Sequence, residues 1–306
     1  MTQAIPSETY RSGYVALVGR PNVGKSTLLN AYLGQKLAAV SSRPQTTRLQ
    51  QLAILSLDQA QIIFVDTPGL HQPHHKLGER MNEVALAALE DADLVLVMFD
   101  ASEDPTDEDE RVVKALEQTA ADQPKLAVLN KVDLSDAETL AERQAAFERL
   151  LRDVPLLAVS ATRGDHREDL LDRIIAILPE GPQYYNPETT TDLYEREIAA
   201  DWIRAACLEL LQQEVPYSIA VRIDEYKERG ETGAYIAATL FVERDSQKGI
   251  VIGKRGAMLR KIGMMARAQI EAMSGRKVYL DLRVKALPGW RNDDGVLSRF
   301  GFGAKA

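Results

Sequence analysis

The sequence contains one cysteine, Cys207, among 306 residues, so no disulfide can form within the chain. No run of about eighteen apolar residues occurs, and hydropathy therefore excludes a membrane-spanning helix. Residues 1–12 are polar and carry no apolar stretch, so we expect neither a secretory signal nor a transit peptide. These absences are typical of a protein in a reducing compartment, and we expect a cytoplasmic location.

The chain as a whole also lacks an excess of basic residues, because its net charge is −8. Residues 244–291 depart from this balance, with 12 lysines and arginines against 3 acidic residues. Such a local excess indicates a surface that binds a polyanion, although a merely solvated charged surface is the alternative. The length of 306 residues favours two domains.

Buried-strand patterns alternate with helical patterns from Tyr14 to about Leu178. The expected strands cover residues 15–18, 52–57, 62–65, 94–99, 125–129 and 156–159, and the expected helices between them cover 77–89, 108–118, 137–151 and 167–178. This alternation predicts a doubly wound, mostly parallel α/β sheet with helices on both faces. Ligands of such sheets bind beyond the carboxyl ends of the strands.

A phosphate-loop motif, G-x-x-x-x-G-K-[ST], stands between the first strand and a helical pattern. Its residues, all predicted to bind nucleotide, are Gly19, Arg20, Pro21, Asn22, Val23, Gly24, Lys25, Ser26 and Thr27. Backbone N–H groups of such a loop surround phosphate at a helix N-terminus. Lys25 is expected to reach the β- and γ-phosphates, and Ser26 to bind Mg²⁺. A glycine turn that binds nothing is the alternative, and the strand-loop-helix context disfavours it.

A second motif directly follows the strand at 62–65 and comprises Asp66, Thr67, Pro68 and Gly69. We expect Asp66 to hold Mg²⁺ through its water shell, and Gly69 to donate its backbone N–H to the terminal phosphate. A polar loop at residues 41–48 precedes this motif, and we expect it to order when a γ-phosphate is present. One of its threonines, Thr46 or Thr47, is predicted to complete the Mg²⁺ coordination. The predicted catalytic residues are Lys25, Thr46, Thr47 and Gly69.

Two further motifs predict recognition of guanine. Asn130, Lys131 and Asp133 follow the strand at 125–129, and Ser160 and Ala161 follow the strand at 156–159. Asp133 can accept two hydrogen bonds from guanine, which adenine cannot supply, while Asn130 meets the other edge of the base. The Ala161 N–H is expected to meet the guanine carbonyl. An ATP-dependent metabolic enzyme, the alternative, conflicts with this pattern.

These motifs, in this order, resemble the translation-factor-related GTPases, and G-R-P-N-V-G-K-S-T and Q-T-T-R are similar to the bacterial ribosome-assembly members. Leu70 stands where many members have the glutamine that orients the attacking water, so slow intrinsic hydrolysis or help from elsewhere is implied. In relatives with asparagine at the position of Asn22, that residue can coordinate K⁺, so the resemblance implies K⁺ as a second cofactor beside Mg²⁺. A metal site at the histidines 71, 74 and 75 is disfavoured, because no cysteine lies near them.

Three prolines between Leu178 and Pro187 predict a domain boundary. We therefore expect a GTPase domain at 1–180, a linker at 181–191 and a second domain at 192–306. The second domain reads as a helix at 192–211, strands at 217–223 and 234–242, two helices, and a strand at 277–284, which is an α+β order. The tail after Trp290 is expected to be irregular.

The turn between the last two helices carries the sequence Gly253, Lys254, Arg255 and Gly256. Two glycines let a nucleic-acid backbone approach, and the basic residues between them can meet its phosphates. A plain helix turn is the alternative. Together with the element order and the basic segment, the turn resembles a type II KH domain, for which the predicted RNA-binding residues are Ile252, Gly253, Lys254, Arg255, Gly256, Arg260 and Lys261.

A KH domain that follows this GTPase resembles the Era family of bacterial GTPases, over residues 14 to about 290. The resemblance implies GTP and GDP as ligands, RNA near the 3′ end of 16S ribosomal RNA as partner, and a role in the maturation and assembly of the small (30S) ribosomal subunit. It also implies peripheral association with the inner face of the cell membrane, although no lipidation motif is present. An RNA-binding regulatory module that hydrolyses GTP negligibly is the alternative, and Leu70 keeps it open.

Overall fold

The computed structural model describes residues 10–41, 43–230 and 232–302. Residues 1–9, Ser42, Glu231 and residues 303–306, to which parts of the expectations above refer, lie outside this description. The chain falls into two compact units. Unit 1 comprises residues 1–33, 51–67 and 86–192, and unit 2 comprises residues 34–50, 68–85 and 193–306. The two segments that flank residues 51–67 thus belong to the same unit as the C-terminal third of the chain.

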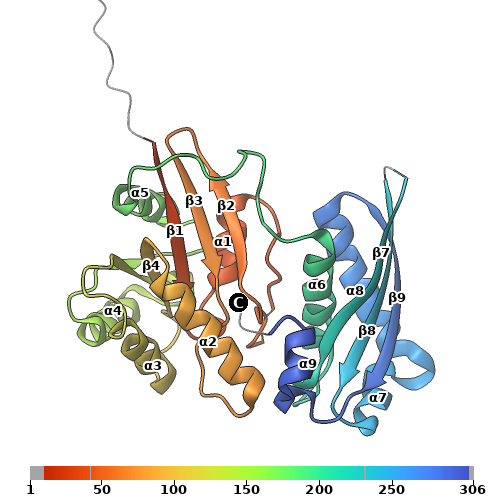
Figure 1. Cartoon of the computed structure of the whole chain (residues 1–306). Coiled ribbons are helices and arrows are strands. Elements are labelled where there is room, and N and C mark those ends of the chain that lie inside the picture. Colours follow the sequence, from red (N-terminus) through yellow and green to blue (C-terminus); the bar gives the residue numbers. More distant parts are fainter. Residues whose placement is uncertain (1–9, 42, 231, 303–306) are drawn as a thin grey trace, which may run out of the picture. The chain divides into compact units, whose positions relative to one another are not determined.

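Unit 1 contains a six-stranded sheet in the order β2-β3-β1-β4-β5-β6 (Figure 1). Its strands are β1 (Arg11–Val18), β2 (Gln51–Ser56), β3 (Ala60–Asp66), β4 (Leu94–Asp100), β5 (Lys125–Asn130) and β6 (Leu156–Ala158). All neighbouring pairs are parallel except β2 and β3. Every residue of β3 and β4 is buried, as their uninterrupted apolar sequences require when helices cover both faces. The predicted α/β architecture is therefore confirmed.

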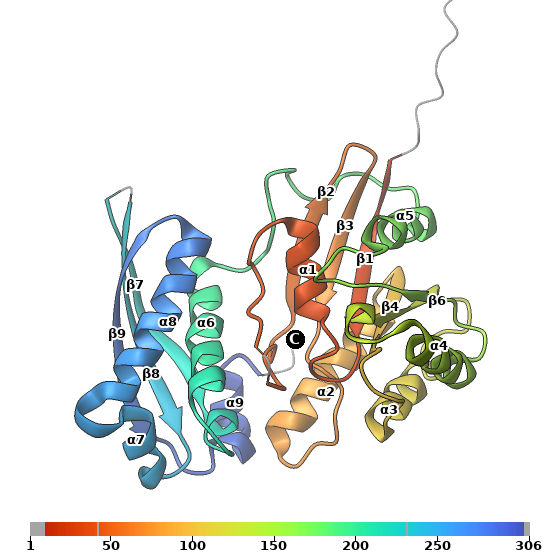
Figure 2. The same ribbon diagram turned by 180° about the vertical axis from the view of Figure 1, so that it is seen from behind.

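Helices pack on both faces of this sheet. They are α1 (Lys25–Leu33), α3 (Asp107–Leu116), α4 (Ala137–Leu151) and α5 (Arg167–Ile177). Helix α2 (Lys76–Glu90) is divided between the two units. Tyr32 of α1 stacks on Phe64 of β3, with ring centroids 5.8 Å apart, and α1 lies in front of the sheet in Figure 2. Phe147 of α4 packs on Phe99 of β4. Phe64 and Leu94 both align with Val15, so their side chains lie on the same face of the sheet. Side chains alternate along a strand, and Phe99 is five residues after Leu94, so Phe99 points to the opposite face.

The segment predicted to be a linker is hydrogen-bonded to the sheet of unit 1. The Gln61 side chain accepts from the backbone N–H groups of Tyr184 and Tyr185, and the Ile54 N–H donates to the Thr190 carbonyl at 2.9 Å. Prolines end helix α5 as expected, but the chain beyond them continues along strands β1 to β3 as far as Asp192. The backbone groups of this segment are satisfied by the sheet rather than by water.

Unit 2 contains a three-stranded sheet in the order β7-β8-β9. Its elements are α6 (Glu195–Leu210), β7 (Ala220–Arg229), β8 (Gly233–Val242), α7 (Asp245–Ile252), α8 (Ala257–Ser274), β9 (Lys277–Ala286) and α9 (Asp294–Arg299). Strand β8 is antiparallel to β7 and parallel to β9. The predicted order from the first helix to the last strand is confirmed, although β7 begins later than expected because a 3₁₀ turn occupies Pro216–Ser218.

The expectation of an irregular tail was wrong for the described residues after Trp290. Asp293 caps α9 by accepting a hydrogen bond from the Val296 N–H at 3.0 Å. Trp290 is fully buried and donates from Nε1 to the Ser218 carbonyl at 2.9 Å. It belongs to an apolar cluster of unit 2 that also includes residues of α9, and the members are Leu77, Met81, Ala220, Phe241, Trp290, Val296, Leu297 and Phe302. Burial of this cluster orders a segment too short to be recognised as a helix by periodicity.

Cys207 lies buried in α6, as expected for a small core residue. Burial raises the pKa of its thiol to about 12, so the side chain stays protonated at neutral pH. Among the described residues, none of the helices is both long and apolar enough to cross a membrane.

Candidate functional site

The predicted nucleotide motifs of unit 1 meet at one edge of the sheet. Gly19 follows β1, Asp66 ends β3, Asn130 ends β5, and Ser160 lies two residues beyond β6. These strands are parallel to one another, so their carboxyl ends lie at the same edge. The site of unit 1 is therefore assembled from loops that are far apart in the sequence.

Asn130 joins three of these loops. Its Nδ2 donates to the Val23 carbonyl at 2.8 Å, and its Oδ1 accepts from the Ala161 N–H at 2.9 Å. Gly24 adopts a φ of +105°, and a Cβ at this position would lie 2.2 Å from Asn130 Nδ2, so only glycine fits. The Asn130 amide and the Ala161 N–H, both predicted to meet the base, thus also hold these loops together.

Lys25 is buried at the start of α1. Its Nζ donates to the carbonyls of Gly19, at 3.0 Å, and Arg20, at 3.1 Å, both in the phosphate loop. The pKa of Lys25 is lowered to about 8, chiefly by burial, while Asp66 opposes the shift and Arg20 adds to it. A phosphate group would supply the negative charge that these neutral carbonyls provide only in part.

Oxygen ligands suited to a hard cation gather beside the phosphate loop. Ser26 Oγ donates to Asp66 Oδ2 at 3.0 Å, and Gln51 Nε2 donates to the same oxygen at 3.1 Å. Thr67 is fully buried, and its hydroxyl donates to the Leu17 carbonyl at 2.6 Å, which fixes the end of β3 against β1. A hydroxyl and a carboxylate this close fit Mg²⁺, which prefers oxygen ligands.

The residues predicted to read the base lie together. Ser160 Oγ donates to Asp133 Oδ1 at 2.6 Å, so one oxygen of that carboxylate is oriented by the loop after β6. Lys131, between Asn130 and the short 3₁₀ turn at Val132–Leu134, has a left-handed backbone with φ of +68°. Its Nζ donates to Asp100 Oδ2 at 2.5 Å, a contact that no sequence motif predicted.

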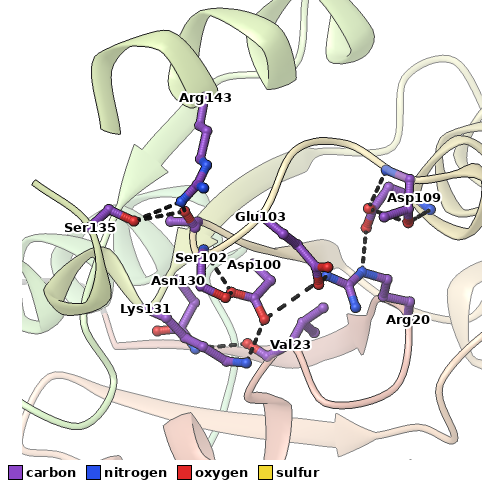
Figure 3. A network of polar contacts seen from close by, with 12 residues as sticks. Arg20, Val23, Asp100, Ser102, Glu103, Asp109, Asn130, Lys131, Ser135 and Arg143 are labelled. Atoms are coloured by element: carbon purple, nitrogen blue, oxygen red, sulfur yellow. Dashed lines mark hydrogen bonds and ion pairs between the residues drawn. The ribbon is translucent and has the colours of Figure 1, made fainter. Parts of the chain in front are cut away.

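Arg20 takes part in a second network that sequence reasoning missed (Figure 3). Its Nε donates to Asp109 Oδ1 at 3.1 Å, and its Nη2 pairs with Glu103 and lies 3.9 Å from Asp100 Oδ2. Only 11% of the Arg20 side chain is exposed. Since its guanidinium is held by carboxylates, Arg20 is poorly suited to act as an arginine finger on a phosphate. The acidic residues that follow β4 were the sequence signal for this network, but they belong to no motif.

Thr46 and Thr47 belong to unit 2, where two buried arginines hold their segment. Arg204 of α6 donates from Nη1 to the Gln45 carbonyl at 2.8 Å and from Nη2 to the Thr46 carbonyl. Arg48 donates to the carbonyls of Ile219, at 2.7 Å, and Tyr217, at 2.8 Å. The Thr46 hydroxyl donates to the Arg43 carbonyl at 3.0 Å. The loop that we expected to order with a γ-phosphate is thus bonded to α6 and to the residues before β7.

The segment after the Asp66 motif is buried as well. Pro68, Gly69 and Leu70 are buried in unit 2, with Leu70 only 5% exposed. The Gly69 carbonyl lies 2.9 Å from His71 Nδ1. Among the described residues, no group of three or more histidine, cysteine or acidic side chains is arranged to hold a metal ion.

The predicted RNA-binding turn joins α7 to α8 in unit 2. Gly253 adopts a φ of +71°, and a Cβ there would lie 2.7 Å from the Cβ of Met258, so glycine is required. Arg255 also has a left-handed backbone, with φ of +52°. The exposed basic residues of this region are Lys254, Arg255, Arg260 and Lys261, beside the partly buried Ile252, Gly253 and Gly256. The turn therefore presents cations and bare backbone to solvent.

Two family models match the chain. Residues 14–131 match a model described as 50S ribosome-binding GTPase, and residues 214–291 match a model described as KH domain. The second match covers β7 to β9 and the turn at Gly253–Gly256.

Curated relatives and solved structures match almost the whole chain. GTPase Era of Geobacter metallireducens is 44% identical over 294 residues, which are 96% of this chain and 98% of the relative. GTPase Era of Thermotoga petrophila is 45% identical over 288 residues, with 94% and 95% covered.

A structure of Era with MgGDPNP and nucleotides 1506–1542 of 16S ribosomal RNA superposes with a TM-score of 0.91 at 37% identity, covering 96% of this chain and 99% of that chain. A variant of Aquifex aeolicus Era bound to GDP·AlF4⁻ superposes with a TM-score of 0.90 at the same identity and coverage. The motifs at the sheet edge, the KH turn and these similarities lead to one conclusion: the chain belongs to the Era family of GTPases.

Proposed function

We propose that this GTPase is a nucleotide-controlled switch that binds the 3′ region of 16S ribosomal RNA and assists maturation and assembly of the small (30S) ribosomal subunit. The observation that carries the proposal is the similarity, along 96% of the chain, to an Era structure holding both MgGDPNP and an RNA segment. In this proposal residues 1–180 bind nucleotide, residues 181–191 link, and residues 192–306 bind RNA.

The nucleotide would bind at the carboxyl edge of the unit 1 sheet. The loop of residues 19–27 would surround the phosphates, and the Lys25 ammonium would exchange its two carbonyl partners for phosphate oxygens. Asp133, oriented by Ser160, would accept hydrogen bonds from guanine. Asn130, whose amide holds the phosphate loop and the Ala161 loop in place, would meet the other edge of the base, and the Ala161 N–H would meet the guanine carbonyl. Lys131 would flank the base.

Mg²⁺ fits the oxygen donors of Ser26 and Asp66, which lie 3.0 Å apart. When bound, Mg²⁺ neutralises charge on the β- and γ-phosphates and orients them. Thr46 or Thr47 would join this site, and the Thr46 hydroxyl would first have to leave the Arg43 carbonyl. Gly69 would donate its N–H to the γ-phosphate.

Hydrolysis would be slow without further help. Leu70 has no polar atom to orient water, and Arg20 is held by Asp109 and Glu103. We propose that Asn22, whose φ is +67° in the phosphate loop, coordinates K⁺, whose charge would stabilise the transition state. Equal rates of GTP hydrolysis in K⁺ and Na⁺ buffers would contradict this role.

RNA would bind at the turn between α7 and α8. Lys254 and Arg255 would meet phosphates, Gly253 and Gly256 would let the strand approach, and Ile252 would contact a base. Arg260 and Lys261, exposed on the first turns of α8, extend the same basic surface.

Nucleotide state could reach the KH domain through unit 2 itself. The loop at 34–50 and the residues 68–85 both belong to unit 2, and Arg204 bonds the Gln45 and Thr46 carbonyls directly. If the loop at 34–50 binds a γ-phosphate, this binding would compete with the hydrogen bonds from Arg204 to the backbone of the loop. We further propose a cytoplasmic protein that associates peripherally with the inner face of the cell membrane, which rests on family likeness alone.

The test is single-turnover GTP hydrolysis with Mg²⁺ and K⁺, with and without an RNA that ends in the 3′ sequence of 16S ribosomal RNA. The proposal expects hydrolysis that depends on Lys25, and preferential recovery of that RNA region when the intact protein is crosslinked in cells. Absence of hydrolysis under every condition would favour the alternative, a regulatory RNA-binding module, and recovery of unrelated RNA would contradict the proposed partner.

A further inference from the structure

The carboxylate of Asp100 occupies a central place in the network of Figure 3. Asp100 is the last residue of β4 and is 3% exposed. Its Oδ1 accepts hydrogen bonds from the Ser102 N–H at 2.9 Å and the Ser102 hydroxyl at 2.6 Å. Its Oδ2 accepts from Lys131 Nζ at 2.5 Å. Both oxygens therefore have fixed partners, and the carboxylate cannot rotate without losing them.

The same oxygen faces a second cation from the phosphate loop. Arg20 Nη2 lies 3.9 Å from Asp100 Oδ2, and Arg20 Nε bonds Asp109. Asp109 is fully buried, and its other oxygen accepts from the N–H and hydroxyl of Thr106, which caps α3. The phosphate loop is thus tied to the start of α3, while Asp100 lies between this tie and the loop that carries Lys131.

Burial by itself would raise the pKa of Asp100, but the hydrogen bonds from Lys131 and Ser102 outweigh burial and hold that pKa below its usual value. The carboxylate is therefore charged at neutral pH. A charged group this deeply buried is retained only if its partners are correctly placed, since unpaired burial is costly. The arrangement depends on Lys131 remaining where it is, although its backbone has the uncommon φ of +68°.

We propose that Asp100 is a positioning residue for guanine-nucleotide binding. It holds Lys131 beside the base and keeps the loop that carries Lys131 and the phosphate loop in one arrangement. The inference rests on the proposed function, because it assigns no contact between Asp100 and the nucleotide. Without Asp100, the Lys131 side chain loses its partner and faces the Arg20 guanidinium across the same space. Nucleotide binding must then order both loops at a cost in free energy. The complex is less stable as a result, and nucleotide dissociates from it faster.

The test is the dissociation rate of fluorescent GDP and a non-hydrolysable GTP analogue from the full chain, measured by stopped flow. Asp100→Asn keeps the size of the side chain and an oxygen for Ser102 but cannot accept from Lys131 in the same way. We expect both dissociation rates to rise about tenfold, the usual effect of one charge-assisted hydrogen bond, and by the same factor because the γ-phosphate is not involved. Asp107→Asn is the matched control, since it removes the same charge from an exposed position of α3.

A double-mutant cycle with Lys131→Met separates positioning from general stability. If Asp100 acts through Lys131, Asp100→Asn adds little to the dissociation rate once Lys131 is replaced, so the two effects are not multiplicative. Multiplicative effects, or an Asp100→Asn rate equal to that of Asp107→Asn, would overturn the inference. Rates are measured on the fraction of protein that binds nucleotide, so loss of folded protein does not imitate the effect. Failure of the wild-type chain to bind GDP would instead contradict the proposed function.

Discussion

The guanidinium of Arg204, on helix α6, donates to the backbone carbonyls of Gln45, at 2.8 Å, and of Thr46. The same side chain is 5% exposed and pairs with Asp201 at 2.8 Å. An element before the KH sheet thereby holds the loop that is proposed to sense the γ-phosphate. Hydrogen bonds from a charged donor in a buried place are among the stronger ones in proteins.

Replacement of Arg204 should therefore uncouple RNA binding from nucleotide state. In Arg204→Gln, we expect the difference in RNA affinity between the GDP form and the form with a GTP analogue to fall at least severalfold, as measured by fluorescence anisotropy with a 16S 3′-end RNA. We also expect unfolding to require about 2 kcal/mol less, because carbonyls bonded by Arg204 lose a charged partner. Arg196→Gln, at an exposed position of the same helix, is the control. An unchanged difference between the two nucleotide states would show that coupling does not pass through Arg204.

Nucleotide affinity should fall as pH rises above about 8, because the pKa of Lys25 is about 8 in the protein without nucleotide. Phosphate favours the protonated ammonium, so the pKa of Lys25 rises when nucleotide binds. At a pH about half a unit above the pKa of the nucleotide-free protein, binding therefore takes up a proton. Isothermal titration of GDP at that pH, in buffers of different ionisation enthalpy, should reveal this uptake. Lys25→Ala should abolish nucleotide binding and leave RNA binding intact. Proton uptake that is absent under these conditions would contradict the proposed contact of Lys25 with phosphate.

Charge reversal at the KH turn should weaken RNA binding and leave GDP binding unchanged. For Lys254→Asp with Arg255→Asp, we expect RNA affinity to fall at least tenfold, and the slope of log affinity against log salt concentration to become shallower by about 1.4 for single-stranded RNA. The matched control is Lys114→Asp with Arg173→Asp, two exposed positions of unit 1 that change the net charge equally. Equal losses of RNA affinity in the two double variants, or a parallel loss of GDP affinity, would argue against an RNA site at this turn.

The stability of unit 2 should decrease as pH falls below about 6.5, because burial, together with Arg291 and Arg48, lowers the pKa of His75 to about 4. The unfolded chain binds a proton at His75 from about pH 6.5 downwards, whereas the folded chain does so only near pH 4. The contribution of His75 to stability is therefore complete above about pH 6.5 and is lost as pH falls from 6.5 to about 4. Urea unfolding at about pH 7 and about pH 5, on either side of the unfolded value, measures the loss.

In His75→Asn this loss should be smaller, since asparagine does not titrate and can still accept from the Gly78 N–H, which lies 3.1 Å from His75 Nδ1. His74→Asn, at an exposed position, should retain the full pH dependence. Identical pH dependence in wild type and His75→Asn would assign the effect to another group.

Local sequence patterns predicted the elements well where burial and periodicity agree. The α/β order of the first half and the helix and strand order of the second half follow from apolar patterns, which each segment carries by itself. The tail after Trp290 was mispredicted, because α9 is six residues long and is stabilised by Trp290, Phe241 and Leu77, which lie far apart in the sequence.

The site was predicted in part for the same reason. Contiguous motifs predicted roles for the phosphate loop, Asp66, Asp133 and the KH turn, because loop chemistry there depends on neighbouring residues. Asp100 and Arg204 belong to no contiguous motif, and their partners lie 31 residues and about 160 residues away in the chain.

The sequence by itself determined which loops are proposed to carry the nucleotide and RNA chemistry, since the spacing of glycine, lysine and carboxylate residues lies within each motif. Only the tertiary structure decided that residues 34–50 and 68–85 pack with the C-terminal third of the chain, and that Asp100 lies between Lys131 and Arg20. The physical reason is that buried hydrogen bonds and ion pairs are selected by the partner that folding brings near, which no local pattern encodes.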